Sequence, residues 1–397
     1  MHTLMFFSQR RSSRRRAQVG FTLVEMLVMM VILAALVIVA TQYLYSSWGV
    51  QSLAYMEAQM KTSAEKGLNT LGRHLTESTK LMGRGEGESY VNKLNMSQAP
   101  RPIPNSQLPL VRKSGSVSPE KNCEVSPSEY FLPNAVGNSL MFFENLKEHR
   151  LSASAGFTAP QNFSILQLNY VYITDNAQDS AYLERPQQPI RVGTSTLPAQ
   201  HLIRWRSVPV MGYNQLRDYY QSLDAKGQGA DKSKAAQSLH ATGVKVAWDA
   251  DAPNANDAFY DVRTNGTLSK HNGSYRLEML AFEDTLRLGK GDGTTYSVSY
   301  NSNTDENHPG FFPVPPRIKV PYYYSPTLQP GVNCPQITPV PTATPALDFS
   351  FPRGFEVVVV GPQSGRQVLM HVSMVAKGYS QKTTAQSHSI SSYARDL

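Results

Sequence analysis

One acidic side chain, Glu25, interrupts an otherwise apolar run of 24 residues, Phe21 to Leu44. A carboxylate costs on the order of 2 to 3 kcal/mol near the centre of a bilayer and less near its surface, so an anchor alone has no need of one. Such a carboxylate can pair with an amine, because pairing removes much of the cost that each buried charge has alone. The alternative is an acid in the first helical turn that reaches the membrane surface and is favoured by the helix dipole.

The run that carries Glu25 predicts a membrane-crossing helix. Its 24 residues would span roughly 36 Å as a helix, enough to cross a hydrocarbon core of about 30 Å. Five arginines lie among the first 20 residues, and the next charge after the run is Glu57. This asymmetry predicts that the N-terminus is cytoplasmic and that the rest of the chain lies outside. A secretory signal peptide has a shorter apolar region and an A-x-A-like cleavage site, and residues 37–55 contain no such site.

The sequence around Glu25 resembles the class III signal of type IV pilins and type II secretion pseudopilins. Arginines 14–16, Gly20, Phe21 and Glu25 occur in the order typical of that family, before an unbroken apolar segment. In the family a membrane prepilin peptidase cuts after the glycine and methylates the new N-terminal amine. The resemblance therefore implies cleavage between Gly20 and Phe21. It also implies that Glu25 pairs with the Phe21 amine of a neighbouring subunit during assembly.

Beyond Tyr45 the helical pattern becomes one-sided. Apolar residues recur at spacings of three and four, which places on one stripe Leu53, Met56, Met60, Ala64, Leu68, Leu71 and Leu75. Opposite charges four residues apart, such as Lys61 and Glu65, lie on other faces. The pattern predicts one helix from about Phe21 to Met82, ended by the glycines of residues 83–87, with its outer half packed on a globular domain.

The chain after the helix is mainly β in pattern. Strand-like runs occupy residues 165–173, 201–206, 275–282, 355–360 and 368–376. The glycine- and proline-containing segment 361–365 predicts a hairpin between the last two runs, and residues 213–223 and 232–240 could each form a short helix. The expected fold class is α+β and pilin-like, with a long N-terminal helix packed on a mainly antiparallel β-sheet domain that carries large loop insertions.

The predicted organisation has seven segments. They are a basic leader (1–20), a transmembrane and assembly helix (21–45), its amphipathic continuation (46–82), a loop insertion (83–135), a β-rich globular domain (136–300), a Pro- and Tyr-rich insertion (301–348), and a C-terminal hairpin and tail (349–397). Eleven prolines in residues 309–345 predict an extended surface flap, whose aromatic side chains make it a candidate partner surface. Cys123 and Cys334 lie in the two insertions, and a disulfide between them is permitted if the domain is exported.

Composition and motifs exclude several function classes. The net charge is +8, but removing the five leader arginines leaves 33 basic against 30 acidic side chains, so a nucleic-acid partner is not established. No zinc-protease, redox, serine-hydrolase or phosphate-loop motif occurs, so we expect no enzyme, no cofactor and no metal. Residues 249–257 and 301–306 begin like calcium loops but lack the glycine and distal glutamate of an EF-hand.

The expected function follows from the resemblance. Residues 71–75 and 391–397 look like PilW-type minor pilins and J-type pseudopilins, and a large chain with insertions suits a low-copy subunit. We expect a minor pilin of a priming or tip complex in type IV pilus assembly. The alternatives are a type II secretion or DNA-uptake pseudopilin, or a membrane-tethered periplasmic enzyme or binding protein.

The same resemblance implies the partners and the location. The implied partners are other minor and major pilins or pseudopilins, prepilin peptidase, the inner membrane and its assembly platform. The implied location is the inner membrane, with the globular domain in the periplasm, followed by incorporation into a pilus or pseudopilus.

Overall fold

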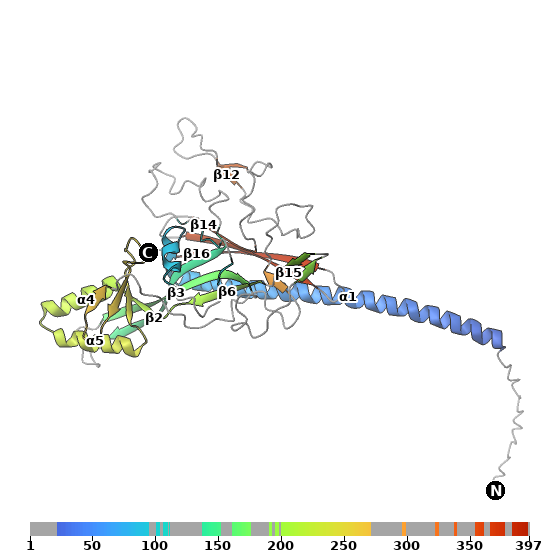
Figure 1. Cartoon of the computed structure of the whole chain (residues 1–397), viewed down its shortest axis with the longest axis horizontal. Coiled ribbons are helices and arrows are strands. Elements are labelled where there is room, and N and C mark those ends of the chain that lie inside the picture. The colour runs from blue at the N-terminus through green and yellow to red at the C-terminus, as the bar shows by residue number, and fades with distance from the viewer. Residues whose placement is uncertain are drawn as a thin grey trace, which may run out of the picture. The chain divides into compact units, whose positions relative to one another are not determined.

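The structure is a computed structural model of the whole chain (Figure 1). It describes residues 22–94, 101–103, 106–109, 111, 137–151, 161–175, 190–192, 195–197, 200–270, 296–298, 322–324, 337–339, 354–360, 366–377 and 383–395. Several sequence predictions lie outside these residues: the leader with Gly20 and Phe21, both cysteines, the strand at 275–282, the loop at 301–306 and the turn at 361–365.

The N-terminal part is mainly one helix, α1 (Leu23–Thr76). The chain divides into two compact units, Met1–Gln51 and Ser52–Leu397. In the first unit the side chains from Leu23 to Ser46 are exposed on every face of the helix. In the second unit the predicted stripe is confirmed: Leu53 is half-buried, and Met56, Met60, Ala64, Leu68, Leu71 and Leu75 are buried. Lys61 and Glu65 face solvent 4.0 Å apart.

The predicted end of the helix at Met82 is wrong, because α1 ends at Thr76 and strand β1 (Ser78–Met82) follows. β1 pairs antiparallel with β2 (Ser139–Leu151). The neighbouring residues Leu81 and Met82 enter two different hydrophobic cores, as consecutive residues of a strand do and residues of a helix do not. Pairing with β2 therefore determines the conformation here. A short helix, α2 (Glu86–Val91), then occupies part of the predicted loop insertion.

An eight-stranded sheet forms the centre of the second unit, in the order β1-β2-β3-β7-β8-β9-β10, with β6 also paired to β3. Its remaining strands are β3 (Gln161–Asp175), β6 (Gln200–Arg206), β7 (Val210–Gly212), β8 (Val246–Trp248), β9 (Phe259–Val262) and β10 (Leu268–Lys270). Among these described strands every pairing is antiparallel except β7 with β8. The predicted strands at 165–173 and 201–206 correspond to β3 and β6.

A second antiparallel sheet consists of β11 (Tyr296–Val298), β14 (Phe355–Val360), β15 (Arg366–Lys377) and β16 (Thr383–Ala394), with β15 paired to the other three. The predicted pairing of 355–360 with 368–376 is confirmed by β14 and β15. Gly137 and Val357 exchange backbone hydrogen bonds of 2.9 and 2.8 Å, which connect the second sheet to the start of β2.

Smaller elements complete the described chain. Helices α4 (Tyr213–Ala225) and α5 (Gly229–Ala241) lie side by side (Figure 1) and confirm the two predicted short helices. Two-stranded sheets form from β4 (Ile190–Val192) with β5 (Ser195–Leu197) and from β12 (Tyr322–Tyr324) with β13 (Ile337–Pro339). The Pro- and Tyr-rich insertion therefore contains a strand pair, where the sequence predicted only an extended flap.

Three hydrophobic cores follow from the alternation of the strands. The first lies where α1 packs on both sheets and includes Met60, Leu68, Phe142, Val171 and Val357. The second covers the opposite side of the large sheet, and the third lies beneath α4 and α5. The α+β layout of a long helix packed on a mainly antiparallel sheet is thus confirmed.

Candidate functional site

The N-terminus of α1 is closed by a capping box that uses Glu25. The Thr22 carbonyl accepts the first helical hydrogen bond, from the Met26 amide, so Thr22 is the N-cap residue. Thr22 Oγ1 accepts from the Glu25 amide at 3.2 Å, and Glu25 Oε2 accepts from the Thr22 amide at 3.0 Å. The Thr22 hydroxyl lies 3.1 Å from the same carboxylate oxygen. The acid therefore satisfies an amide that the helix leaves unpaired, and it lies at the positive end of the helix dipole.

The surface behind this cap is apolar on every side. Side chains from Leu23 to Leu44 are exposed, and within the described residues α1 is the one helix long and apolar enough to cross a membrane. Gly20 and Phe21 lie outside the described residues, so the structure places the predicted assembly residue Glu25 but not the predicted cleavage site.

Aromatic side chains mark the other end of the apolar segment. Tyr43, Tyr45 and Trp48 are exposed, and the Tyr45 and Trp48 rings meet edge to face with centroids 6.5 Å apart. Tyr and Trp are enriched where a membrane-spanning helix leaves the hydrocarbon, because their rings are apolar and their tips polar. The segment thus has a carboxylate in a capping box at one end and three exposed aromatic side chains at the other.

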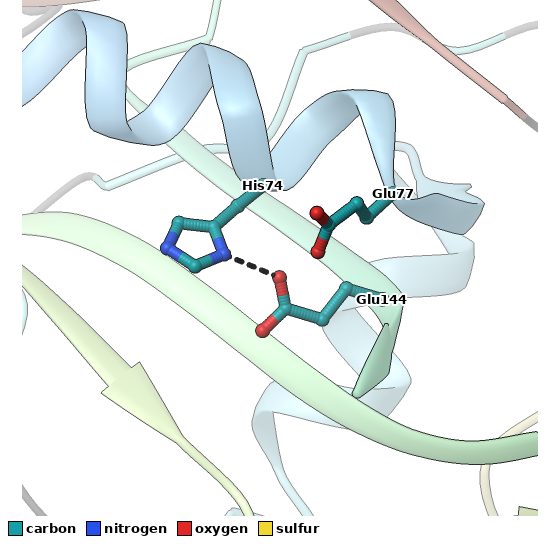
Figure 2. A group of neighbouring side chains, drawn as sticks. All are labelled: His74, Glu77 and Glu144. Carbon is teal, nitrogen blue, oxygen red and sulfur yellow. Dashed lines mark hydrogen bonds and ion pairs between the residues drawn. The ribbon is translucent and has the colours of Figure 1, made fainter. Parts of the chain in front are cut away.

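A second polar group lies at the opposite end of α1, where the helix meets the sheet (Figure 2). His74 belongs to the last turn of α1, Glu77 to the single-residue connection to β1, and Glu144 to β2. His74 Nδ1 lies 2.7 Å from Glu144 Oε2, and one ligand atom of each residue lies within 4.8 Å of the others. The Asn145 amide donates to the Glu77 carbonyl at 3.0 Å and holds the connection against β2.

Buried charge surrounds this group, which we call the His74–Glu77–Glu144 cluster. The Glu144 side chain is 4% exposed and that of His74 17%. Arg204 on β6 is fully buried, and burial lowers its pKa to about 10, an effect that Glu144 opposes and that Arg206 and Arg73 reinforce. Burial lowers the pKa of Arg206 as well, again opposed by Glu144. Glu144 thus interacts with a histidine of α1 and two arginines of β6.

The cluster could not be assembled from the sequence, although a signal for its members exists. Glu144 and Arg204 are each single charges inside apolar strand runs, Met-Phe-Phe-Glu-Asn-Leu and Leu-Ile-Arg-Trp. A charge at a core-facing strand position needs a partner. The partner, however, is set by the register of β2, β3 and β6, which sequence periodicity does not give.

The calcium-like loop at 249–257 uses its oxygens in local turns. Asp249 Oδ1 accepts from the Asp251 amide at 3.1 Å, and Asn254 Oδ1 accepts from the amides of Asn256 and Asp257 at 2.9 and 3.3 Å. Asp257 pairs with Lys270 at 2.7 Å, which lowers the pKa of Asp257. These contacts explain the acidic and amide residues as turn-forming groups.

Comparison with models of known families, with characterised proteins and with solved structures gives no significant match.

Proposed function

We propose that the chain is a minor pilin, PilW-like, that is anchored in the inner membrane by α1 and takes part in type IV pilus assembly. A pseudopilin role in type II secretion or DNA uptake uses the same machinery and is the second candidate. One observation carries the proposal: the single acid of the exposed apolar segment, Glu25, lies at the third position of the helix, directly after the Gly20–Phe21 signal.

The capping geometry is compatible with pairing between subunits. The backbone amide and the hydroxyl of Thr22 both donate to Glu25 Oε2, which leaves Oε1 for a cation from a neighbouring chain. Cleavage before Phe21 would create such a cation, and N-methylation would keep its charge. In a bundle of apolar helices, an amine and a carboxylate that are paired avoid the cost of two isolated buried charges.

The remainder of the chain supports a subunit role. The same helix that carries Glu25 continues, from Ser52 on, as the buried central helix of the α+β unit. The aromatic group at 43–48 fits the outer surface of the membrane, and the leader arginines fit the cytoplasmic side. The apolar segment would then be a membrane anchor before extraction and a bundle element afterwards.

Three substitutions of Glu25 separate capping from charge pairing. Gln serves in a capping box as Glu does but has no charge, so Glu25→Gln keeps the cap and removes the ion pair. Glu25→Ala removes the cap and the ion pair. Glu25→Asp keeps the charge on a side chain that is about one methylene shorter. We expect all three chains to insert in the membrane, and Glu25→Gln and Glu25→Ala to lose co-purification with the other minor pilins to the same extent.

Two results would contradict this mechanism. Normal co-purification of Glu25→Ala would return the residue to the role of an acid at the membrane surface. Rescue by Glu25→Gln but not by Glu25→Asp would show that the hydrogen bond to Thr22, and not the charge, is what assembly requires.

A further inference from the structure

We propose that the His74–Glu77–Glu144 cluster is a binding site for a zinc-like divalent transition-metal ion. This role is separate from membrane anchoring and pilus assembly, because all three residues belong to the second unit of the chain. The cluster offers one imidazole nitrogen and two carboxylate oxygens, a donor set typical of three-ligand zinc sites that keep a fourth position open.

The geometry of the three donors fits such an ion. Zinc bonds of about 2.1 Å in a tetrahedral arrangement separate two ligand atoms by about 3.4 Å. His74 Nδ1 and Glu144 Oε2 are 2.7 Å apart and would move apart by about 0.7 Å to hold the ion, and the Glu77 oxygen lies within 4.8 Å of both donors. Glu77 is exposed to solvent, so its side chain can adjust its position. The ion would then bridge the last turn of α1, the connection and β2.

A fourth potential donor, a third oxygen, lies next to Glu144. Gln167 on β3 is the direct cross-strand partner of Glu144, so the two side chains share a face of the sheet. Gln167 is 2% exposed and donates Nε2–H to the Ser207 carbonyl at 2.7 Å. Its Oε1 atom is buried and accepts no hydrogen bond from any residue that the structure describes. A buried acceptor of this kind is costly unless a donor or a cation satisfies it.

Nearby arginines compete with a bound cation, and the imidazole donor determines which cations the cluster prefers. Arg204 and Arg206 interact with the charge of Glu144, and Arg73 acts on Arg204, so an incoming cation must compete for Glu144. Ca²⁺ and Mg²⁺ prefer all-oxygen sites and gain little from an imidazole, whereas Zn²⁺ binds imidazole nitrogen well. The site should therefore accept Zn²⁺ and reject Ca²⁺ and Mg²⁺.

The test uses the full chain, purified in detergent with a tag that contains no histidine. Titration with ZnCl₂ should give one bound equivalent and a higher unfolding temperature, and CaCl₂ and MgCl₂ should give neither. Residues that only hydrogen-bond to metal ligands contribute about 10- to 100-fold in metal affinity, so losing a ligand itself should cost at least as much. We expect His74→Gln to weaken zinc binding at least about 100-fold and Glu77→Gln at least about 10-fold.

Two matched controls lie outside the cluster. His149→Gln, on β2, and Glu88→Gln, exposed on α2, should leave zinc affinity unchanged. Glu77→Gln alters an exposed side chain, so it tests the site without a risk to folding. The proposal is overturned if the folded wild-type chain binds no zinc, if binding survives both His74→Gln and Glu77→Gln, or if Ca²⁺ binds as tightly as Zn²⁺.

Discussion

Met60 and Met29 are two methionines of one helix in opposite surroundings, and their truncation measures what the outer half of α1 contributes. Met60 is 0% exposed in the core between α1 and both sheets, and Met29 is 56% exposed in the apolar segment. Complete burial of a methionine side chain contributes about 1.5–3 kcal/mol, and the cavity left by truncation adds to the loss. Met60→Ala should therefore lower the free energy of unfolding by about 3 kcal/mol, within the 2–5 kcal/mol known for such changes.

Fluorescence can follow this unfolding, because two of the three tryptophans, Trp205 and Trp248, are buried in the second unit. The third, Trp48, is exposed on α1, and Trp48→Phe removes its background. In urea titrations of the full chain in detergent, Met60→Ala should shift the midpoint strongly and Met29→Ala should not. Equal, negligible shifts for both variants would refute the argument that α1 is the central helix of the folded unit.

Two further predictions concern the α5 region and the second sheet. Gly266 has a φ of +79°, and an added Cβ would lie 2.4 Å from Lys232 Cβ. In urea titrations Gly266→Ala should therefore destabilise the fold by about 1–3 kcal/mol. At Gly229 no atom lies within 4 Å of an added Cβ, so Gly229→Ala should change stability by less than about 0.5 kcal/mol. Burial, aided by His388, lowers the pKa of His371, which lies opposite Glu356 in the sheet. Protonation therefore favours the unfolded chain, and stability should be complete above the unfolded pKa of about 6.5 and fall by at most about 1.4 kcal/mol per pH unit below it. His371→Gln should reduce this loss between pH 7.5 and 5.5, and an unchanged loss would contradict the assignment.

The elements that could be predicted are those with strong local patterns. The stripe on α1 has helical spacing, and β3, β6, β14 and β15 are rich in branched and aromatic residues. β16 was missed because Thr-Thr-Ala-Gln-Ser-His-Ser-Ile is polar, and its conformation depends on twelve paired positions with β15. β1 was assigned to the helix because only its pairing with β2 distinguishes it from a further helical turn.

Two buried glycines of α1 lie on the side that packs on the folded unit. Gly67 and Gly72 are buried on α1, and Ser392 of β16 donates a hydrogen bond to the Gly72 carbonyl at 2.9 Å. An added Cβ at Gly72 would lie 3.4 Å from Ser392 Oγ. The second sheet thus contacts the helix at Gly72, which the linear sequence could not show.

The candidate sites divide in the same way. Glu25 could be singled out from the sequence because it is the one acid of an apolar run and its cap residue is a close neighbour in the chain. The His74–Glu77–Glu144 cluster was not, because His74 and Glu144 are 70 residues apart and meet only through the packing of α1 on β2.

The mature N-terminus of the protein tests the proposed function most directly. Mass spectrometry of the chain isolated from its native membrane should find a protein that begins at Phe21 and carries an N-methyl group. A native chain that still begins at Met1, or one that is cut well beyond Phe21, would contradict the proposed pilin-like function.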